Sequence, residues 1–181
     1  MFALIIFLSA LFAVIAYSVM AAMSDYRGMT IPNMHSVVIF AAFVVCYLLV
    51  WLLGGGSAFA PILSHLLGFA VVFVGGFALF ALRVWGAGDQ KLCSALAIWM
   101  GFSGVPMFLV YTSLFGGLLG LVALLLRKYK PVKEPAAGSW VDQVQGGAGK
   151  VPYGIAIVLG ALASFAKIGY FSVDTFRVFL G

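Results

Sequence analysis

Four runs of sequence without a charged side chain dominate the hydropathy pattern, over residues 1–24, 28–82, 92–126 and 151–166. About 20 consecutive apolar residues cross the hydrocarbon core of a bilayer as a helix. Dividing the runs at their Gly, Pro, Ser and Asn clusters predicts spans over residues 2–23, 35–53, 60–82, 92–103, 106–126 and 152–167. The pattern therefore predicts an all-α, polytopic membrane protein of about six transmembrane helices.

The run over residues 92–126 is either one long helix or two helices joined at residues 101–106. Lys and Arg are enriched in cytoplasmic loops. Six spans with the N-terminus outside place eight of the ten basic residues on the cytoplasmic side. If residues 92–126 formed one span, the basic residues would instead divide evenly between the two sides. The eight are Arg27, Arg83, Lys91, Arg127, Lys128, Lys130, Lys133 and Lys150, with Lys167 and Arg177 opposite. We therefore expect two helices, although the first piece reaches only about 18 Å.

The spans leave little chain for anything outside the membrane. We expect one integral membrane domain over residues 1–181, without a separate soluble domain. The long connector over residues 127–150 is rich in Gly, Pro, Lys and Ala, which is typical of a flexible loop, and it is predicted on the cytoplasmic side. Residues 169–181 are expected to form a short amphipathic helix on the opposite membrane surface. Trp51, Trp85 and Trp99 are expected in the interfacial aromatic belt.

Composition agrees with the hydropathy pattern. The 181 residues are 65% hydrophobic and 8% charged, whereas about a quarter of a soluble chain is charged. This excludes a disordered chain, a disulfide scaffold and a water-soluble enzyme. Because the net charge of +5 comes from connector residues, we expect no nucleic-acid partner, and we expect anionic lipid headgroups on the cytoplasmic face. Oligomeric state is left open.

The remaining candidates for metal or cofactor chemistry are few. Cys46 and Cys93 are single cysteines inside apolar runs, so we expect them to pack in the core. His35 and His65 fall on opposite sides of the membrane under the predicted topology, so they do not share a metal. The sequence therefore predicts no metal site and no cofactor.

Two acidic residues are the strongest candidates for function. Of the five, only Asp25 and Asp89 lie against the ends of predicted spans, both on the cytoplasmic side. Acidic side chains at membrane depth are costly and typical of functional sites. Two adjacent carboxylates share a proton, so one can activate water while the other donates a proton, as in aspartic peptide hydrolysis. The alternative is structural, with each carboxylate capping a helix or pairing with a nearby Arg or Lys.

The residues around these aspartates are consistent with both interpretations. Gly86 and Gly88 allow a loop to present Asp89 to an extended substrate, but any tight turn before a helix uses such residues. Pro32 and Asn33 restart a helix after the turn that follows Asp25. Helix dipoles favour Asp89, at a helix N-terminus, as the ionised base, and Asp25, near a helix C-terminus, as the proton carrier.

Three motifs together resemble the prepilin peptidases, which are membrane aspartyl proteases of the Gly-x-Gly-Asp type. They are Asp25 with the Ile-Pro-Asn turn at 31–33, Gly-Ala-Gly-Asp at 86–89 followed by Lys91, and Pro-Tyr-Gly at 152–154 with Gly160. The resemblance implies that Asp25 and Asp89 are the catalytic pair. The positioning residues are then Gly86, Gly88, Lys91, Pro32 and Asn33.

The resemblance also implies a substrate and a location. The substrate is a type IV pilin-like precursor, cut after its short leader at the cytoplasmic side of a bacterial inner membrane. Longer members of the family carry paired Cys-x-x-Cys zinc ligands and also methylate the new amino terminus. This sequence contains no Cys-x-x-Cys, so we expect no methyltransferase activity and a likeness to the short form that serves tight-adherence, Flp-type pili.

Other functions remain open at this stage. A broader intramembrane aspartyl protease would use the same two carboxylates on other single-span substrates. A small proton- or ion-coupled transporter would use them to bind its ion, although a transport site is expected near the membrane midplane. A scaffold subunit of a secretion machine would keep the spans and have no need of both aspartates.

Overall fold

The computed structural model describes residues 1–54, 59–149 and 151–180, and within them every regular element is a helix. The helices are α1 (Phe2–Gly28), α2 (Asn33–Leu52), α3 (Ile62–Ala81), α4 (Ala87–Tyr129), α5 (Trp140–Gln145), α6 (Tyr153–Lys167) and α7 (Val173–Leu180). The predicted all-α class is confirmed. Lys150, one of the eight basic residues assigned to the cytoplasmic side, lies outside the described residues.

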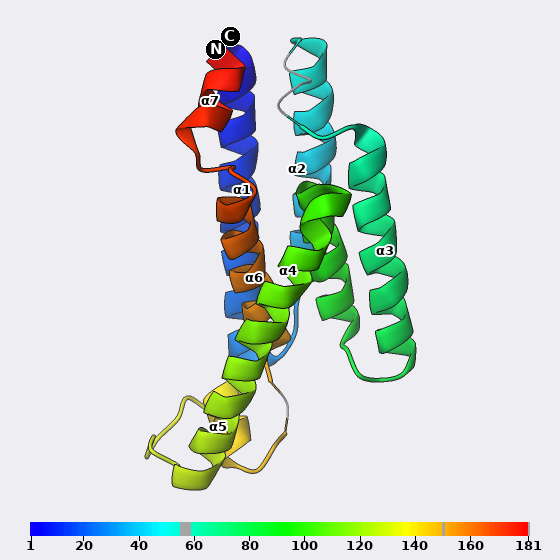
Figure 1. Cartoon of the computed structure of the whole chain (residues 1–181). Helices are drawn as coiled ribbons and strands as arrows, with labels where there is room; N and C mark the ends of the chain where they lie inside the picture. Colours follow the sequence, from blue (N-terminus) through cyan, green and yellow to red (C-terminus); the bar gives the residue numbers. More distant parts are fainter. Residues whose placement is uncertain (55–58, 150, 181) are drawn as a thin grey trace.

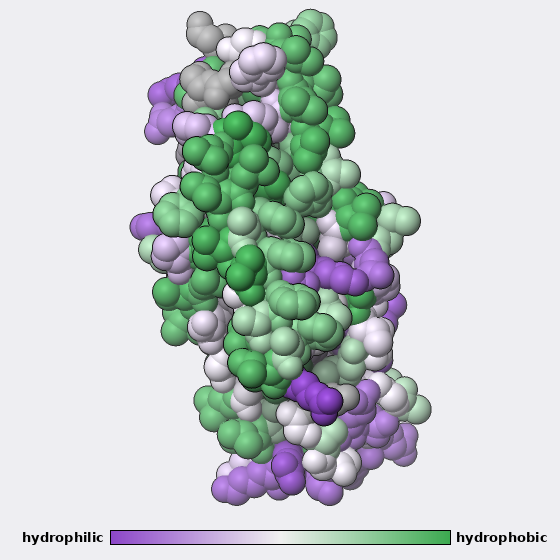
Figure 2. Space-filling model, turned by 90° about the vertical axis from the view of Figure 1, so that its right-hand side faces the viewer, coloured by the Kyte–Doolittle hydropathy of each residue, from purple (hydrophilic) through white to green (hydrophobic). Residues whose placement is uncertain are grey.

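The outer surface is that of a multi-pass membrane protein. Among the described residues, α1, α2, α3 and α4 are long and apolar enough to cross a membrane, and α6 is a shorter apolar helix. Hydrophobic residues cover most of the face in Figure 2, and hydrophilic residues gather most densely at its lower end. Such a band of exposed apolar side chains is what contact with lipid requires.

Helix α4 consists of two limbs that run in opposite directions. Its 43 residues would extend about 65 Å as a straight helix, roughly twice the hydrocarbon core. The helix is broken at Gly101, whose φ of 63° and ψ of 167° suit only glycine. In Figure 1 the first limb, residues 87–100, rises beside α3, and the second limb, residues 102–129, descends. The predicted break within residues 101–106 is confirmed, and the number of membrane crossings stays a prediction.

Each limb of α4 packs against a different helix. The Phe102 N–H donates to Ser64 Oγ of α3 at 3.0 Å, which fastens the turn between the limbs. The second limb packs against α6, where a Cβ added to Gly160 would lie 2.7 Å from the Thr112 backbone nitrogen. Small residues allow such close approach of membrane helices. Helix α1 in turn packs against α2 and α6.

The basic residues segregate to the two ends of this bundle. Helices α1 and α3 end, and α2, α4 and α6 begin, at what we call the lower end (Figure 1). Arg27, Arg83 and Lys91 lie there, together with the basic residues at 127–133, whereas Lys167 and Arg177 lie at the opposite end. The arrangement supports the separation inferred from the sequence. Which end faces the cytoplasm stays a prediction.

The expected position of Trp99 is wrong. Its side chain is 0% exposed, and its indole N–H donates to the Ile39 carbonyl of α2 at 3.0 Å. The neighbouring helix satisfies the one polar group of the indole, so Trp99 packs in the core instead of the membrane interface. Trp51, by contrast, is 61% exposed at the end of α2. Cys46 and Cys93 are buried free thiols, as expected of core residues.

The connector over residues 127–150 is more regular than the sequence suggested. Helix α4 continues to Tyr129, and α5 begins after Ser139, whose Oγ accepts the Asp142 N–H at 3.3 Å as an N-cap. Trp140 and Val144 are buried, and α5 packs against α1 and α4. The apolar face of α5 and its cap explain why this part of the predicted loop is helical.

The C-terminal segment contains the predicted short helix, α7. The helix packs against the start of α1, where the rings of Phe179 and Phe7 stack with centroids 4.9 Å apart. Asp174 and Arg177 form an exposed ion pair at 3.4 Å on its outer side. The placement of α7 along a membrane surface stays a prediction.

Candidate active site

Asp25 is held by a helix other than its own. It lies in the last turn of α1, is 5% exposed, and accepts the Gly154 N–H of α6 on its Oδ2 at 2.7 Å. The first N–H groups of a helix have no partner within that helix and favour an anion. The C-terminus of α1 alone would favour the predicted proton on Asp25. The N-terminus of α6 opposes that effect.

Asp89 is bound in a capping arrangement. It is the third residue of α4, and its Oδ2 accepts the Gly86 N–H at 3.3 Å. The capping role named as an alternative is therefore present. The carboxylates of Asp89 and Asp25 also lie close enough for their charges to interact. The fold thus brings together two acids from distant parts of the sequence at the lower end.

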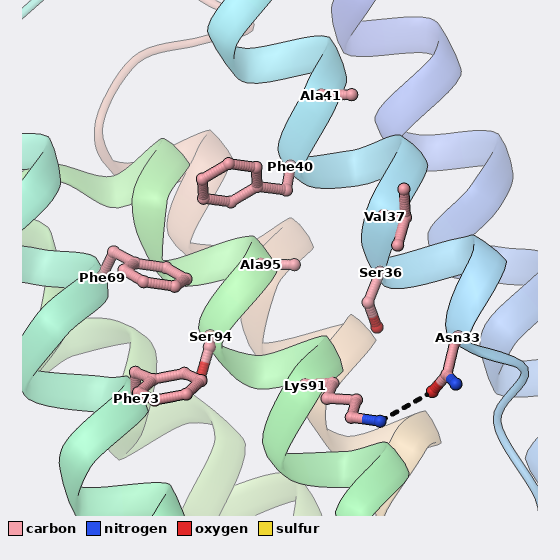
Figure 3. A pocket seen from close by; sticks show the side chains of 10 residues that line it. All are labelled: Asn33, Ser36, Val37, Phe40, Ala41, Phe69, Phe73, Lys91, Ser94 and Ala95. Atoms are coloured by element: carbon pink, nitrogen blue, oxygen red, sulfur yellow. Dashed lines mark hydrogen bonds between the residues drawn. The ribbon is translucent and has the colours of Figure 1, made fainter.

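Neither Asp25 nor Asp89 forms an ion pair with an Arg or Lys among the described residues. Within the described parts of the chain, the one salt bridge joins Asp174 and Arg177. Lys91, a sequence candidate beside Asp89, instead donates from Nζ to Asn33 Oδ1 at 3.0 Å (Figure 3). Lys91 therefore ties the start of α4 to the start of α2. Pro32 occupies the N-cap position of α2, in keeping with its predicted role in restarting a helix.

Ile31 packs against both the start of α4, which carries Asp89, and the start of α6, which holds Asp25. A Cβ added to Gly88 would lie 3.1 Å from Ile31 Cβ, and one added to Gly154 would lie 2.9 Å from Ile31 Cδ1. The glycines allow the first turns of α4 and α6 to close on the connector between α1 and α2. The other candidate glycine, Gly86, would place a Cβ 2.8 Å from Asp89 Oδ2.

Two residues of this arrangement were not among the predicted positioning residues. Ile31 and Gly154 belong to the Ile-Pro-Asn and Pro-Tyr-Gly motifs, but the sequence carried no sign that they meet. The contact of Gly154 with Asp25 spans 129 positions. The available signal was that the Ile-Pro-Asn and Pro-Tyr-Gly motifs both stand at helix starts on the same predicted membrane face.

A cavity of about 520 Å³ lies between α2, α3 and the first limb of α4 (Figure 3). Polar side chains line one end and aromatic rings the other. The lining residues are Asn33, Ser36, Val37, Phe40, Ala41, Phe69, Phe73, Lys91, Ser94 and Ala95. Because Lys91 follows Asp89 by two positions and Asn33 follows Ile31 by two, the polar end adjoins the helix starts that carry the candidate site.

The two histidines do not lie together at this site. His35 lies in the first turn of α2, at the lower end, and His65 in the first turn of α3, at the opposite end. The ring nitrogen Nδ1 of His65 lies 2.6 Å from the Ile98 carbonyl oxygen. Over residues 1–54, 59–149 and 151–180, no group of three or more His, Cys, Asp or Glu side chains could hold a metal ion.

Comparison with known proteins places the chain in a family. Residues 11–121, which include Asp25 and Asp89, match the model of the type IV leader peptidase family. Proteins named prepilin leader peptidase/N-methyltransferase from Aeromonas hydrophila and Aeromonas salmonicida (strain A449) are each 36% identical over 56 residues, or 31% of this chain. That match covers 19% of each relative's length. No solved structure is significantly similar. Because the family match extends over more than half of the sequence, the chain belongs to the type IV leader peptidase family.

Proposed function

We propose that the chain is a membrane aspartyl endopeptidase that removes the short leader of type IV prepilins, of the Flp type, at the cytoplasmic face of a bacterial inner membrane. The observation that carries the proposal is the meeting of Asp25 and Asp89 at one end of the bundle, within the segment that matches the leader peptidase family. The names of the relatives supply the substrate class. Peptidase activity alone is proposed, because the sequence has no Cys-x-x-Cys pair.

The geometry suits water activation by a shared-proton pair. Two carboxylates whose charges repel each other are not both ionised readily, so the pair retains one proton. The ionised carboxylate takes a proton from water as the water oxygen attacks the scissile carbonyl carbon, and the protonated carboxyl donates to the carbonyl oxygen. The proton taken from water then passes to the leaving amine as the C–N bond breaks, and the proton on the former carbonyl oxygen returns to the second carboxylate. The N–H groups of Gly154 and Gly86 hold Oδ2 of Asp25 and Asp89, and we assign Oδ1 of each to water and substrate.

The position of the pair supports a peptidase over an ion-coupled transporter. Asp25 lies in the last turn of α1 and Asp89 in the first turn of α4, so both are at helix ends. A transport site is expected near the midplane of the membrane, commonly at broken helices. The break in α4, at Gly101, lies at the opposite end of the first limb from Asp89. The break and the acids are thus separated.

Coexpression with a Flp-type prepilin tests the proposal, with leader removal followed by gel shift and by N-terminal mass. Asp25→Asn and Asp89→Asn keep the side-chain shape but remove the acid–base group, so each is expected to abolish cleavage while the protein still inserts. Asp174→Asn is the matched control, because Asp174 is exposed at the opposite end of the bundle, and it should process normally. Normal processing by either site variant refutes the aspartyl mechanism.

A panel of substrates separates a leader peptidase from a broader intramembrane protease. The panel contains a Flp-type prepilin, a prepilin of another type and an unrelated single-span protein. We expect cleavage of the Flp-type precursor at its leader and none of the unrelated protein. Equal cleavage of all three would contradict the proposed specificity and leave the aspartyl chemistry standing.

A further inference from the structure

The cavity between α2, α3 and the first limb of α4, here called the α2–α3 groove, combines two kinds of surface. Asn33, Ser36 and Lys91 lie at its polar end, and Phe40 and Phe69 approach each other across its apolar end with ring centroids 5.3 Å apart. Figure 3 shows these side chains converging from α2, α3 and α4. Val37, on its rim, is 59% exposed, so the groove is open to the membrane side.

One polar group in the groove has no partner. Ser36 is 7% exposed, and its buried Oγ has no hydrogen-bond partner within the described chain. Its polar neighbours are engaged, since Ser94 Oγ donates to the Gln90 carbonyl at 2.8 Å and Lys91 donates to Asn33. Burying a hydroxyl without a partner is costly. In Figure 3 the hydroxyl of Ser36 points from α2 into the space beside the Lys91–Asn33 hydrogen bond.

A peptidase that acts in the membrane has to provide hydrogen-bond partners for the backbone of its substrate. The peptide at a scissile bond cannot be helical, and carbonyl groups freed from a helix at membrane depth need donors from the protein. The Ser36 hydroxyl is an unused donor near the start of α2, and Asn33 precedes it by less than one turn. The aromatic end of the groove offers an apolar wall beyond that donor. The volume of about 520 Å³ lies in the usual range of ligand pockets.

We propose that the α2–α3 groove binds the apolar stretch of the precursor next to the scissile peptide, with the Ser36 hydroxyl donating to a backbone carbonyl of that stretch. The aromatic walls take its apolar side chains. The inference rests on the proposed function, because it places the substrate of the Asp25–Asp89 site. A permanently bound lipid acyl chain is the competing occupant.

Removal of the unpaired hydroxyl gives a test in which stability and substrate binding respond differently. Ser36→Ala deletes a buried group without a partner, so the melting temperature should stay the same or rise. The KM for the precursor should rise about 3- to 10-fold through the lost hydrogen bond, with kcat within about twofold. Ser18→Ala is the matched control, because Ser18 is 2% exposed, also has an unpartnered Oγ, and lies on α1 outside the groove.

The outcomes separate this inference from the proposed function. If wild type cleaves the precursor and Ser36→Ala has the wild-type KM, the groove assignment is overturned and the peptidase stands. An equal rise in KM for Ser18→Ala also overturns it, since the effect would then be general to buried hydroxyls. If wild type cleaves no precursor, the proposed function itself fails.

A photocrosslink identifies the occupant directly. A benzophenone amino acid at position 37, on the rim of the groove, is compared with one at position 74, which is exposed on α3 and does not line it. In Asp89→Asn enzyme mixed with precursor, we expect an adduct from position 37 that maps to the apolar stretch of the precursor, and a much weaker adduct from position 74. Adducts with lipid alone at position 37 overturn the proposal.

Discussion

Gly154→Ala tests whether α6 must approach Asp25 as closely as the structure shows. The new Cβ would lie 2.9 Å from Asp25 Oδ2, 2.9 Å from Ile31 Cδ1 and 3.1 Å from Asp25 Cβ. A normal contact of about 3.5 Å requires the helix start to retreat by roughly 0.6 Å. The hydrogen bond from the Gly154 N–H, 2.7 Å long, would then exceed the upper limit of about 3.2 Å for a good bond.

The expected loss follows from the strength of that hydrogen bond. A hydrogen bond to a charged group contributes about 1.5–3 kcal/mol, and about 1.4 kcal/mol corresponds to a tenfold change in rate. We therefore expect Gly154→Ala to lower kcat for prepilin cleavage about 10- to 150-fold. The KM should change little, because Gly154 acts on Asp25 and not on the bound precursor.

The assay is the initial rate of leader removal by purified enzyme in liposomes. Gly117→Ala is the control, because a Cβ at Gly117 meets no atom within 4 Å and alanine is the better helix former; its rate should stay within about twofold of wild type. Wild-type kcat in Gly154→Ala would refute the reasoning. If Gly154→Ala accumulates poorly, adding Ile31→Val removes the Cδ1 clash, and the double variant should recover protein level without recovering kcat.

Three further substitutions test the packing that supports the site. Gly101→Ala forces a side chain into the turn with φ of 63°, at a cost of about 1–3 kcal/mol, and should lower the melting temperature by several degrees. Trp99→Phe loses the donor to the Ile39 carbonyl and should destabilise by about 1–2 kcal/mol in denaturant titration. Gly160→Ala places a Cβ 2.7 Å from the Thr112 backbone nitrogen and should sharply reduce the folded protein recovered from membranes; unchanged values would contradict these contacts.

The sequence predicted the features of the fold that follow from a bilayer environment. Apolar length predicted the helices, and the distribution of Lys and Arg predicted the break that the structure places at Gly101. Helix α5 was missed although a signal was present, since Ser139 followed three positions later by Asp142 is a capping pattern. The Gly- and Pro-rich composition around it masked that pattern.

What the sequence could not predict depends on which helices become neighbours. Trp99 lies near the end of a short apolar piece, a position typical of interfacial tryptophan, and only the carbonyl of Ile39 on another helix explains its burial. Likewise, nothing in the sequence places Gly154 against Asp25. Periodicity describes one helix at a time, whereas both contacts belong to pairs of helices far apart in the chain.

The lower end explains how two carboxylates are accommodated without basic partners. Charged groups in a membrane are usually neutralised by a counter-charge, yet neither Asp25 nor Asp89 has an ion-pair partner in the described structure. Instead, α4 and α6 both begin there and direct main-chain N–H groups at the two acids, and helix starts carry partial positive charge. A full positive charge would hold both acids ionised, whereas partial charges are compatible with the single shared proton that the proposed mechanism requires. Glycine at positions 88 and 154 permits the starts of α4 and α6 to pack closely against Ile31, and glycine at position 86 leaves room for the Asp89 carboxylate.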